Sequence, residues 1–268
     1  MTPAALTEGD FARFQRFIFD AAGITLSASK KALVSGRLAK RLAHHGLPSY
    51  GKYLELLSSG EDRAEVQTAV DLLTTNETYF FREPKHFELL REQAQRAREQ
   101  RRALRVWSAA SSSGEEVYSI AMVLDDVLGS APWEVLGTDI STRVLQRARS
   151  GHYPEERTRH IPPAYLKRYC LRGFGEQQGT VLVTRELRQR VRFAQLNLNE
   201  ALPQMGPFDM VFLRNVMIYF SAETKRQVVG RVIGPLVPGG LFCIGHSETL
   251  NDITQAVQQV APSIYRKP

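Results

Sequence analysis

The feature that most constrains the fold is a change of hydrophobic pattern after Arg102. Downstream of it, short apolar runs alternate with amphipathic stretches, as in LRVWSAA at 104–110 followed by VYSIAMVLDDVL at 117–128. Strands that alternate with helices in this way are typical of a parallel, doubly wound sheet with helices on both faces. The sequence therefore predicts an α/β domain over residues 103–268.

Four further apolar runs continue this alternation. They are residues 133–140, 191–198, 208–216 and 240–246. Ser141 predicts the start of a helix that ends at Gly151, and Ser221 predicts the start of another that ends near Leu236. Because ligands of such sheets bind beyond the carboxyl ends of the strands, polar residues at those ends are the candidates for a site.

Residues 1–75 predict a separate, all-helical domain, because their apolar residues follow helical spacing between breaks at Gly23, Gly46 and Gly60. A charged helix over 84–102 follows, and we expect residues 76–102 to form a linker and connecting helix. Its apolar stripe consists of Phe87, Leu90, Ala94 and Ala97.

The alternation is interrupted between Gly151 and Val191. TVLV at 180–183 follows a glycine-rich turn and precedes a strand at 191–195, so we expect an inserted antiparallel β-subdomain at 152–195. The turn superficially resembles a dinucleotide-binding loop, but it leads into a strand rather than a helix, which favours a hairpin. Its glycines are Gly173, Gly175 and Gly179.

The net charge of +7 is concentrated in residues 157–192, which hold nine basic residues against Glu176 and Glu186. Two cysteines are too few for a disulfide framework or a zinc site. The sequence contains no pattern typical of a signal peptide or a membrane span, so we expect a cytoplasmic protein without direct membrane insertion.

The first strand ends in SAASSSGEE at 108–116, without the glycine-rich fingerprint that binds a pyrophosphate. This disfavours nicotinamide and flavin cofactors, while the small residues still admit a nucleoside. Ser113 and Glu116 have the spacing of a capping box, which we favour over a role of Glu116 in binding a ligand amine. Asp139, at the end of the second strand, is suited either to ribose hydroxyls or to forming a turn, and both alternatives stay open.

Five long motifs, in order, carry a resemblance to a known family. They are TTNETYFFREPKHF at 74–87, RVWSAASSSGEEVYSIAM at 105–122, GTDIS at 137–141, FDMVFLRNVMIYF at 208–220 and GGLFCIGHSETL at 239–250. From about residue 10 to 266, the chain resembles the CheR-type chemotaxis methyltransferases, which use S-adenosylmethionine to esterify glutamate side chains of chemoreceptors. The resemblance implies a Rossmann-like methyltransferase domain.

The resemblance also implies a set of residues around S-adenosylmethionine and its product S-adenosylhomocysteine. They are Asn76, Thr78, Arg82, Glu116, Asp139, Asn197, Leu198, Arg214 and Asn215. Segment 76–102 would then fold over the nucleoside pocket, and Glu116 would serve as cap and ligand contact together. Arg82 would pair with the methionine carboxylate or lie near the sulfonium, and Arg214 or Tyr219 would hold the substrate carboxylate.

Two contacts with the receptor follow from the same resemblance. A basic helix face, which includes Lys30, Arg37, Arg41 and His44, would lie against the receptor's cytoplasmic helices; a merely solvated face is the alternative. The loop RGFGEQQG, with Arg172, Gly173, Gly175 and Gly179, would bind an acidic and aromatic C-terminal peptide of the receptor; an insert made basic for solubility is the alternative. We expect a monomer.

Two other functions stay open. The pI near 9.5 suits a nucleic-acid methyltransferase, but RNVMIY stands where such enzymes carry an Asn- or Asp-Pro-Pro-aromatic motif, so we expect no nucleic-acid partner. The second alternative function is that of a receptor-binding module without methyltransferase activity. An ionised glutamate is already a nucleophile at pH 7, so methyl transfer to it needs no general base. We expect no metal site.

Overall fold

The computed structural model describes residues 5–268, which divide into two compact units. The first comprises the chain up to Thr75 together with Tyr219–Thr224, and the second comprises Asn76–Ile218 and Lys225–Pro268. Among the described residues, no helix combines the length and apolar character that crossing a membrane requires.

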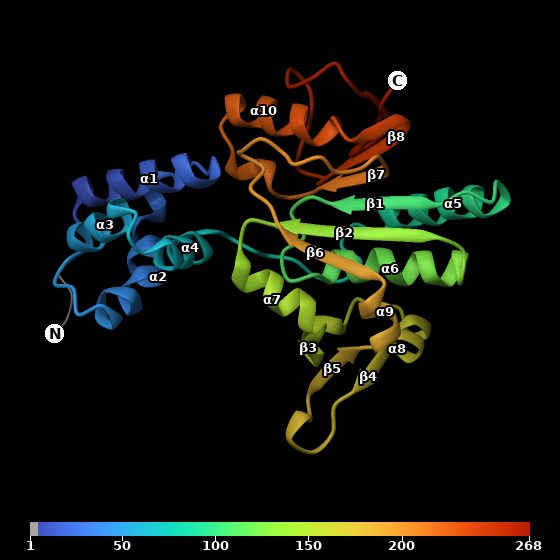
Figure 1. Ribbon diagram of the computed structural model, residues 1–268, viewed down its shortest axis with the longest axis horizontal. Coiled ribbons are helices and arrows are strands. Elements are labelled where there is room, and N and C mark those ends of the chain that lie inside the picture. Colours follow the sequence, from blue (N-terminus) through green and yellow to red (C-terminus); the bar gives the residue numbers. More distant parts are fainter. Residues whose placement is uncertain (1–4) are drawn as a thin grey trace. The chain divides into compact units, whose positions relative to one another are not determined.

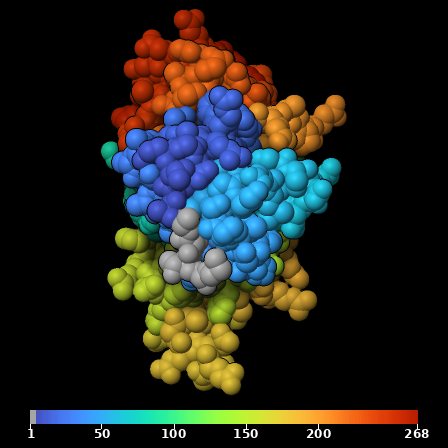
Figure 2. All heavy atoms as spheres, turned by 90° about the vertical axis from the view of Figure 1, so that its left-hand side faces the viewer, coloured from blue at the N-terminus to red at the C-terminus, as the bar shows by residue number. Residues whose placement is uncertain are grey.

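The first unit is helical, which confirms the prediction for this part of the chain, and its surface is in blue in Figure 2. Its elements are α1 (Glu8–Ala22), η1 (Ala28–Lys30), α2 (Lys31–His44), α3 (Tyr50–Ser59) and α4 (Arg63–Leu73). Thr7, Ser49 and Asp62 cap α1, α3 and α4 by accepting backbone N–H groups. Phe14, Ile18, Leu38 and Tyr53 are fully buried and form the centre of its core.

A charged cluster inside this unit joins α2 to α3 and α4. Glu65 is 3% exposed and accepts hydrogen bonds from Nε of Arg41 at 2.9 Å and from the Tyr53 hydroxyl. Burial opposes ionisation of Glu65, but hydrogen bonds from Arg41, Tyr53 and His45 outweigh it and lower its pKa to about 2. Glu65 therefore stays ionised, and Arg41 is a structural residue.

The proposed receptor-binding face of α2 is thus only partly available. Besides Arg41, Arg37 donates to the carbonyl oxygens of Leu73 at 3.1 Å and Thr74 at 3.0 Å, at the end of α4. Lys30 and His44 are exposed. Helical periodicity predicted one basic arc, but it could not reveal that two of its arginines hold helices together.

The second unit is built on a seven-stranded sheet in the order β6-β2-β1-β7-β8-β10-β9. Its strands are β1 (Leu104–Ser108), β2 (Trp133–Asp139), β6 (Val191–Gln195), β7 (Phe208–Leu213), β8 (Leu236–Ile244), β9 (Gln258–Ala261) and β10 (Ile264–Arg266). The first five are parallel to one another, as predicted, and the short β9 and β10 add an antiparallel edge beside β8 that the sequence pattern did not predict.

Helices cover both faces of this sheet, with α6 and α7 on one side and α10 on the other (Figure 1). The larger helices are α5 (Lys85–Glu99), α6 (Glu115–Leu128), α7 (Thr142–Ser150) and α10 (Ala222–Ile233). Ser141 and Ser221 cap α7 and α10 as predicted. The predicted apolar stripe of α5 is buried in the same core cluster as α6, so α5 belongs to this unit rather than bridging the two.

The insert forms a second sheet in the order β3-β5-β4. Its elements are β3 (His152–Pro154), η2 (Glu155–Thr158), α8 (Pro163–Tyr169), β4 (Cys170–Arg172), η3 (Gly175–Gln177), β5 (Thr180–Val183) and α9 (Arg185–Gln189). The hairpin between β4 and β5 confirms the turn predicted at Gly173–Gly179. The expected extent of the insert is too long, because β6 pairs with β2 in the main sheet.

Much of the insert's basic charge holds it to the main domain. Arg157 pairs with the buried Glu115 at the start of α6, and Arg168 and Arg190 pair with Asp125 near its end. Arg192, on β6 of the main sheet, pairs with Glu134 on the neighbouring β2. The charge surplus is therefore a weaker argument for an acidic partner than the sequence suggested.

We predict that Arg41→Ala destabilises the helical unit by roughly 3 kcal/mol, because it leaves the buried Glu65 carboxylate without its cation. Hydrogen–deuterium exchange of peptides from α2 and α4 measures the effect, and Lys40→Ala, on the exposed side of α2, is the matched control. The ordinary pKa of a glutamate is 4.5. The contribution of Glu65 is thus complete above that pH and is lost as the pH falls toward 2, so the difference between wild type and variant should narrow in acid. Equal protection at neutral pH would contradict this account.

Candidate functional site

The carboxyl ends of four parallel strands meet at one edge of the main sheet. They are Ser108 of β1, Asp139 of β2, Gln195 of β6 and Leu213 of β7. The chain proceeds outward from β1 to β2 on one side and from β7 to β8 on the other, so the strand order reverses between β1 and β7. Ligands of doubly wound sheets bind at such a reversal.

Arg214, directly after β7, is the centre of a buried charged cluster at this point. Its side chain is 2% exposed, and it pairs with Glu116 of α6 at 2.7 Å and with Glu83 at 3.0 Å. A third contact goes to the carbonyl oxygen of Arg82. Glu116 also accepts a hydrogen bond from Ser108 of β1 at 2.8 Å. The cluster therefore joins β1, β7, α6 and the segment before α5.

The electrostatics favour the charged forms of Arg214 and Glu83. Burial alone would lower the pKa of Arg214, but the Glu116 and Glu83 carboxylates reverse this and raise it. Burial opposes ionisation of Glu83, yet the Arg214 charge and the backbone N–H of His246 lower its pKa overall. The side chain of Arg214 is buried, and its guanidinium contacts Glu83, Glu116 and the carbonyl oxygen of Arg82, so the contacts observed are those of a positioning residue.

The junction segment, residues 76–84, runs along this strand edge within the second unit. Ser112 donates to the carbonyl oxygen of Asn76 at 3.1 Å, and Arg157 donates to that of Thr78 at 2.8 Å. Phe81 and Glu83 have φ angles of 54° and 60°, which cost free energy for non-glycine residues. The contacts with Arg214 hold this strained backbone in place.

The capping box predicted for Ser113 and Glu116 is wrong. The residue before α6 is Gly114 with a φ of 94°, and it makes no side-chain cap. A Cβ atom on Gly114 would come within 2.9 Å of Ala148 Cβ, so the turn requires glycine. Ser113 instead donates to Glu115 at 2.7 Å, and Glu116 turns toward Arg214.

Asp139 is 7% exposed and connects two of the loops at the sheet edge. One carboxylate oxygen accepts the backbone N–H of Ser112 at 2.9 Å, and the other accepts that of Ser141 at 2.9 Å. These bonds bear out the turn-forming role. They also fix the carboxylate in one orientation at the end of β2.

The remaining predicted residues lie in the loops around this edge. Asn197, after β6, accepts from the backbone N–H of Asn199 and donates to Glu200, while Leu198 is buried. Asn215 follows Arg214 with a φ of 57°, and its N–H donates to Glu248 at 2.9 Å.

Arg82 and Tyr219 occupy different surroundings. The half-buried Arg82 lies over the ring of Tyr79 at 5.6 Å and donates to the carbonyl oxygen of Glu77. Tyr219 ends the short helix η4 (Met217–Tyr219) and is grouped with the first unit, where its carbonyl accepts the N–H of Thr25 at 2.8 Å. Arg82 thus lies within the second unit near the sheet edge, whereas Tyr219 is not placed against it.

Sequence reasoning missed Glu83 and Glu248. Burial raises the pKa of Glu248, although it accepts the backbone N–H groups of Asn215 and Gly245. Glu83 stands beside Arg82 in the motif FFREPKHF, but its partner Arg214 is 131 residues away. Only tertiary structure identifies this pairing.

We predict that Arg214→Lys loosens the junction segment, because one ammonium group cannot span the three acceptors that the guanidinium contacts. Amides of residues 76–83 should exchange with deuterium at least about tenfold faster, equivalent to ~1.4 kcal/mol of opening free energy. Arg105→Lys is the matched control, since the Arg105 guanidinium donates to the Glu134 carboxylate and to the carbonyl oxygen of Pro207 at the opposite end of the sheet. Unchanged exchange in Arg214→Lys would contradict the positioning role.

Comparison with known proteins identifies both units. Residues 9–74 match the family described as CheR methyltransferase, all-alpha domain, and residues 76–265 match CheR methyltransferase, SAM binding domain. The Chemotaxis protein methyltransferase of Escherichia coli (strain K12) is 44% identical over 264 residues, covering 97% of this chain and 91% of that protein. Chemotaxis protein methyltransferase 2 of Pseudomonas aeruginosa is 43% identical over 262 residues, covering 97% and 93%.

A solved structure is more distant. The glycopeptide N-methyltransferase MtfA, complexed with S-adenosylmethionine, has 19% identity and a TM-score of 0.34, covering 57% of this chain and 48% of that one. A similarity at this level has no bearing on function. The two family matches, with relatives above 40% identity along nearly the whole chain, are sufficient: the chain belongs to the CheR methyltransferase family.

Proposed function

We propose that this protein transfers a methyl group from S-adenosylmethionine to glutamate side chains of chemoreceptors, giving the methyl esters used in chemotactic adaptation. The carrying observation is that the SAM binding domain of the family, residues 76–265, brings Glu116, Asp139 and Arg214 to one sheet edge. A nucleoside fits the chemistry of this edge. The loop after β1 presents the small residues Ser111–Ser113, and a carboxylate in a fixed orientation, such as Asp139, suits vicinal ribose hydroxyls.

The residues of the chain position the reactants rather than transfer protons. Bound S-adenosylmethionine supplies an electrophilic methyl group. The attacking glutamate is ionised at pH 7, so the site has to align its oxygen and exclude water; alignment can contribute ~7–11 kcal/mol in favourable cases. We assign contacts with the methionine part or the substrate to Arg82 and Tyr219, and the positioning of Arg82 to Arg214, which bonds its carbonyl oxygen.

Incubation with S-adenosylmethionine labelled in its methyl group tests this function. We expect label on the cytoplasmic helices of a chemoreceptor from the same organism, and release of that label by mild alkali, because methyl esters are hydrolysed there. Label that enters RNA or DNA instead would favour the nucleic-acid methyltransferase. Cofactor binding without label on any receptor would favour the binding module.

Asp139→Asn should weaken S-adenosylhomocysteine binding at least about tenfold in calorimetry, equal to ~1.4 kcal/mol. Asp209→Asn is the matched control, because Asp209 likewise accepts a backbone N–H, that of Arg105 at 2.8 Å, at the opposite end of the sheet. It should lower stability without changing affinity. Equal affinities in wild type and Asp139→Asn would remove Asp139 from the cofactor site.

For the receptor, we propose a second contact on the insert, separate from the strand edge. A groove of about 730 Å³ lies on one face of the small sheet, where His152, Leu182 and Leu171 are lateral neighbours on three strands. Phe174, in the loop with Gly173 and Gly175, lines it and is 88% exposed. The neighbouring Arg172 offers a positive charge, although it pairs with Glu155. An acidic peptide with an aromatic residue fits this surface.

The edge strand β4 adds backbone groups for such a peptide. Docking there raises the local concentration of the receptor and does not alter the chemistry. The exposed Lys30 at the end of η1 and His44 at the end of α2 remain our candidates for contact with the receptor helices. We propose that the protein acts as a monomer.

Leu171→Asp should weaken binding of C-terminal chemoreceptor peptides at least about tenfold, because Leu171 is 56% exposed in the groove. Val260→Asp is the control, as Val260 is 50% exposed on the edge strand of the other sheet. Cofactor binding should persist in both variants. If no peptide binds wild type below roughly 1 mM, or about −4 kcal/mol, the docking proposal is wrong.

A further inference from the structure

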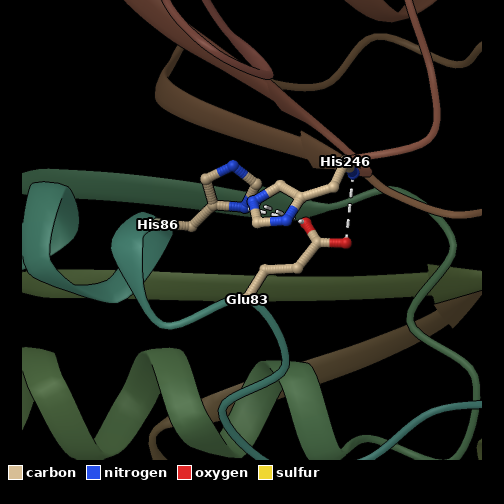
Figure 3. A group of neighbouring side chains, drawn as sticks. All are labelled: Glu83, His86 and His246. Atoms are coloured by element: carbon tan, nitrogen blue, oxygen red, sulfur yellow. Dashed lines mark hydrogen bonds and ion pairs between the residues drawn. The ribbon is translucent and has the colours of Figure 1, made fainter.

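Beside Arg214, its partner Glu83 also approaches two histidines that the proposed reaction does not use. Glu83, His86 at the start of α5 and His246 in the loop after β8 converge on one another, as Figure 3 shows. The two histidine rings are in edge contact, with centroids 5.6 Å apart. Three segments that are distant in sequence therefore meet here. One contains Glu83 and His86, the second contains His246, and the third contains Arg214, which contacts Glu83.

His86 is the unexplained member of this group. It is 0% exposed, and neither of its ring nitrogens has a hydrogen-bond partner. Buried polar atoms without a partner are costly, and each needs an explanation such as an ion. The nitrogen nearest to a charged group is Nδ1, which lies 3.5 Å from the Glu83 carboxylate.

The distances between the Glu83 carboxylate oxygen and the nitrogens of His86 and His246 are close to those between the ligand atoms of a metal centre. Zinc bonds of about 2.0–2.2 Å in a tetrahedron place the ligand atoms about 3.3–3.6 Å apart. Nδ1 of His86 lies 3.5 Å and Nε2 of His246 lies 3.9 Å from the same oxygen of Glu83, and one ligand atom from each residue falls within 4.8 Å of the others. The two distances to Glu83 are thus at or within a few tenths of an ångström of the tetrahedral range, and the two histidine nitrogens would have to approach each other to complete the set.

We propose that Glu83, His86 and His246 bind one divalent transition-metal ion of the zinc class. Two imidazoles and a carboxylate are a zinc ligand set, and three protein ligands leave the fourth position open. His246 is 54% exposed and gives the ion access from solvent, whereas His86 is closed off by Phe212. The two cysteines alone predicted no zinc site, and the proposed site uses neither of them.

A bound ion would share with Arg214 the Glu83 oxygen that both histidines approach, since that oxygen lies 3.0 Å from the guanidinium. Arg214 is the nearest cation, but the carboxylates of Glu83 and Glu116 together exceed its charge by one. A bound ion would tie the junction segment to the loop after β8, next to the contact that His246 N–H already makes with Glu83 at 3.1 Å. The proposal does not depend on methyl transfer.

Titration of ZnCl₂ into the chelator-treated protein tests the site. Calorimetry should show one Zn²⁺ per chain, and Co²⁺ should give the visible absorption of a tetrahedral centre. His246→Gln should weaken binding at least tenfold, because it removes an exposed ligand with little effect on folding. His86→Phe should do the same, and thermal unfolding checks that it remains folded.

His44→Gln is the matched control, since His44 and His45 form the other histidine pair, with ring centroids 4.9 Å apart. It should leave Zn²⁺ affinity unchanged. Loss of binding in this variant, equal affinity in wild type and His246→Gln, or no saturable binding at all overturns the proposal. If Zn²⁺ shows no saturable binding, a proton on Nδ1 of His86 explains why this nitrogen lies 3.5 Å from the Glu83 carboxylate.

Discussion

The buried contact between Arg214 and two carboxylates is the interaction on which the rest of the site depends. Burying three charges is favourable only if each is paired and hydrogen-bonded, and here Glu83, Glu116 and the Arg82 carbonyl satisfy the guanidinium. These partners come from different parts of the chain. The ion pairs therefore fix where the junction segment lies relative to β1, β7 and α6, and they offset the strain of positive φ at Phe81 and Glu83.

A buried ion pair also attaches the insert to the main domain. Arg157 reaches Glu115, whose side chain is completely buried, and it also donates to the Thr78 carbonyl of the junction segment. One arginine thus connects the small sheet, α6 and the segment that we propose to contact the cofactor. A basic composition that first suggests an anionic partner is, to a considerable extent, the internal electrostatics of this fold.

Periodicity predicted the parallel strands, the capped helices and the buried stripe of α5, because those features are encoded locally. Periodicity gave wrong or incomplete predictions where the structure depends on contacts between residues that are distant in sequence. The local pattern could not decide whether the strand at 191–195 ends the insert or belongs to the main sheet, because its partner, β2, lies more than fifty residues earlier. The predicted capping box does not form, because Gly114 before α6 has a positive φ and the Glu116 carboxylate pairs with Arg214 instead. Glu83 was overlooked because an acid next to an arginine has no distinctive local pattern.

The central claim is that Glu83 and Arg214 act together to hold the junction segment, which we propose contacts the cofactor. A double-mutant cycle on S-adenosylhomocysteine affinity, with Glu83→Gln, Arg214→Lys and the double variant, tests it most directly. We expect a coupling energy of at least about 1 kcal/mol, because each single change already breaks the shared contact. Additive effects, within ~0.3–0.5 kcal/mol, would mean that the two residues act independently and would contradict the account.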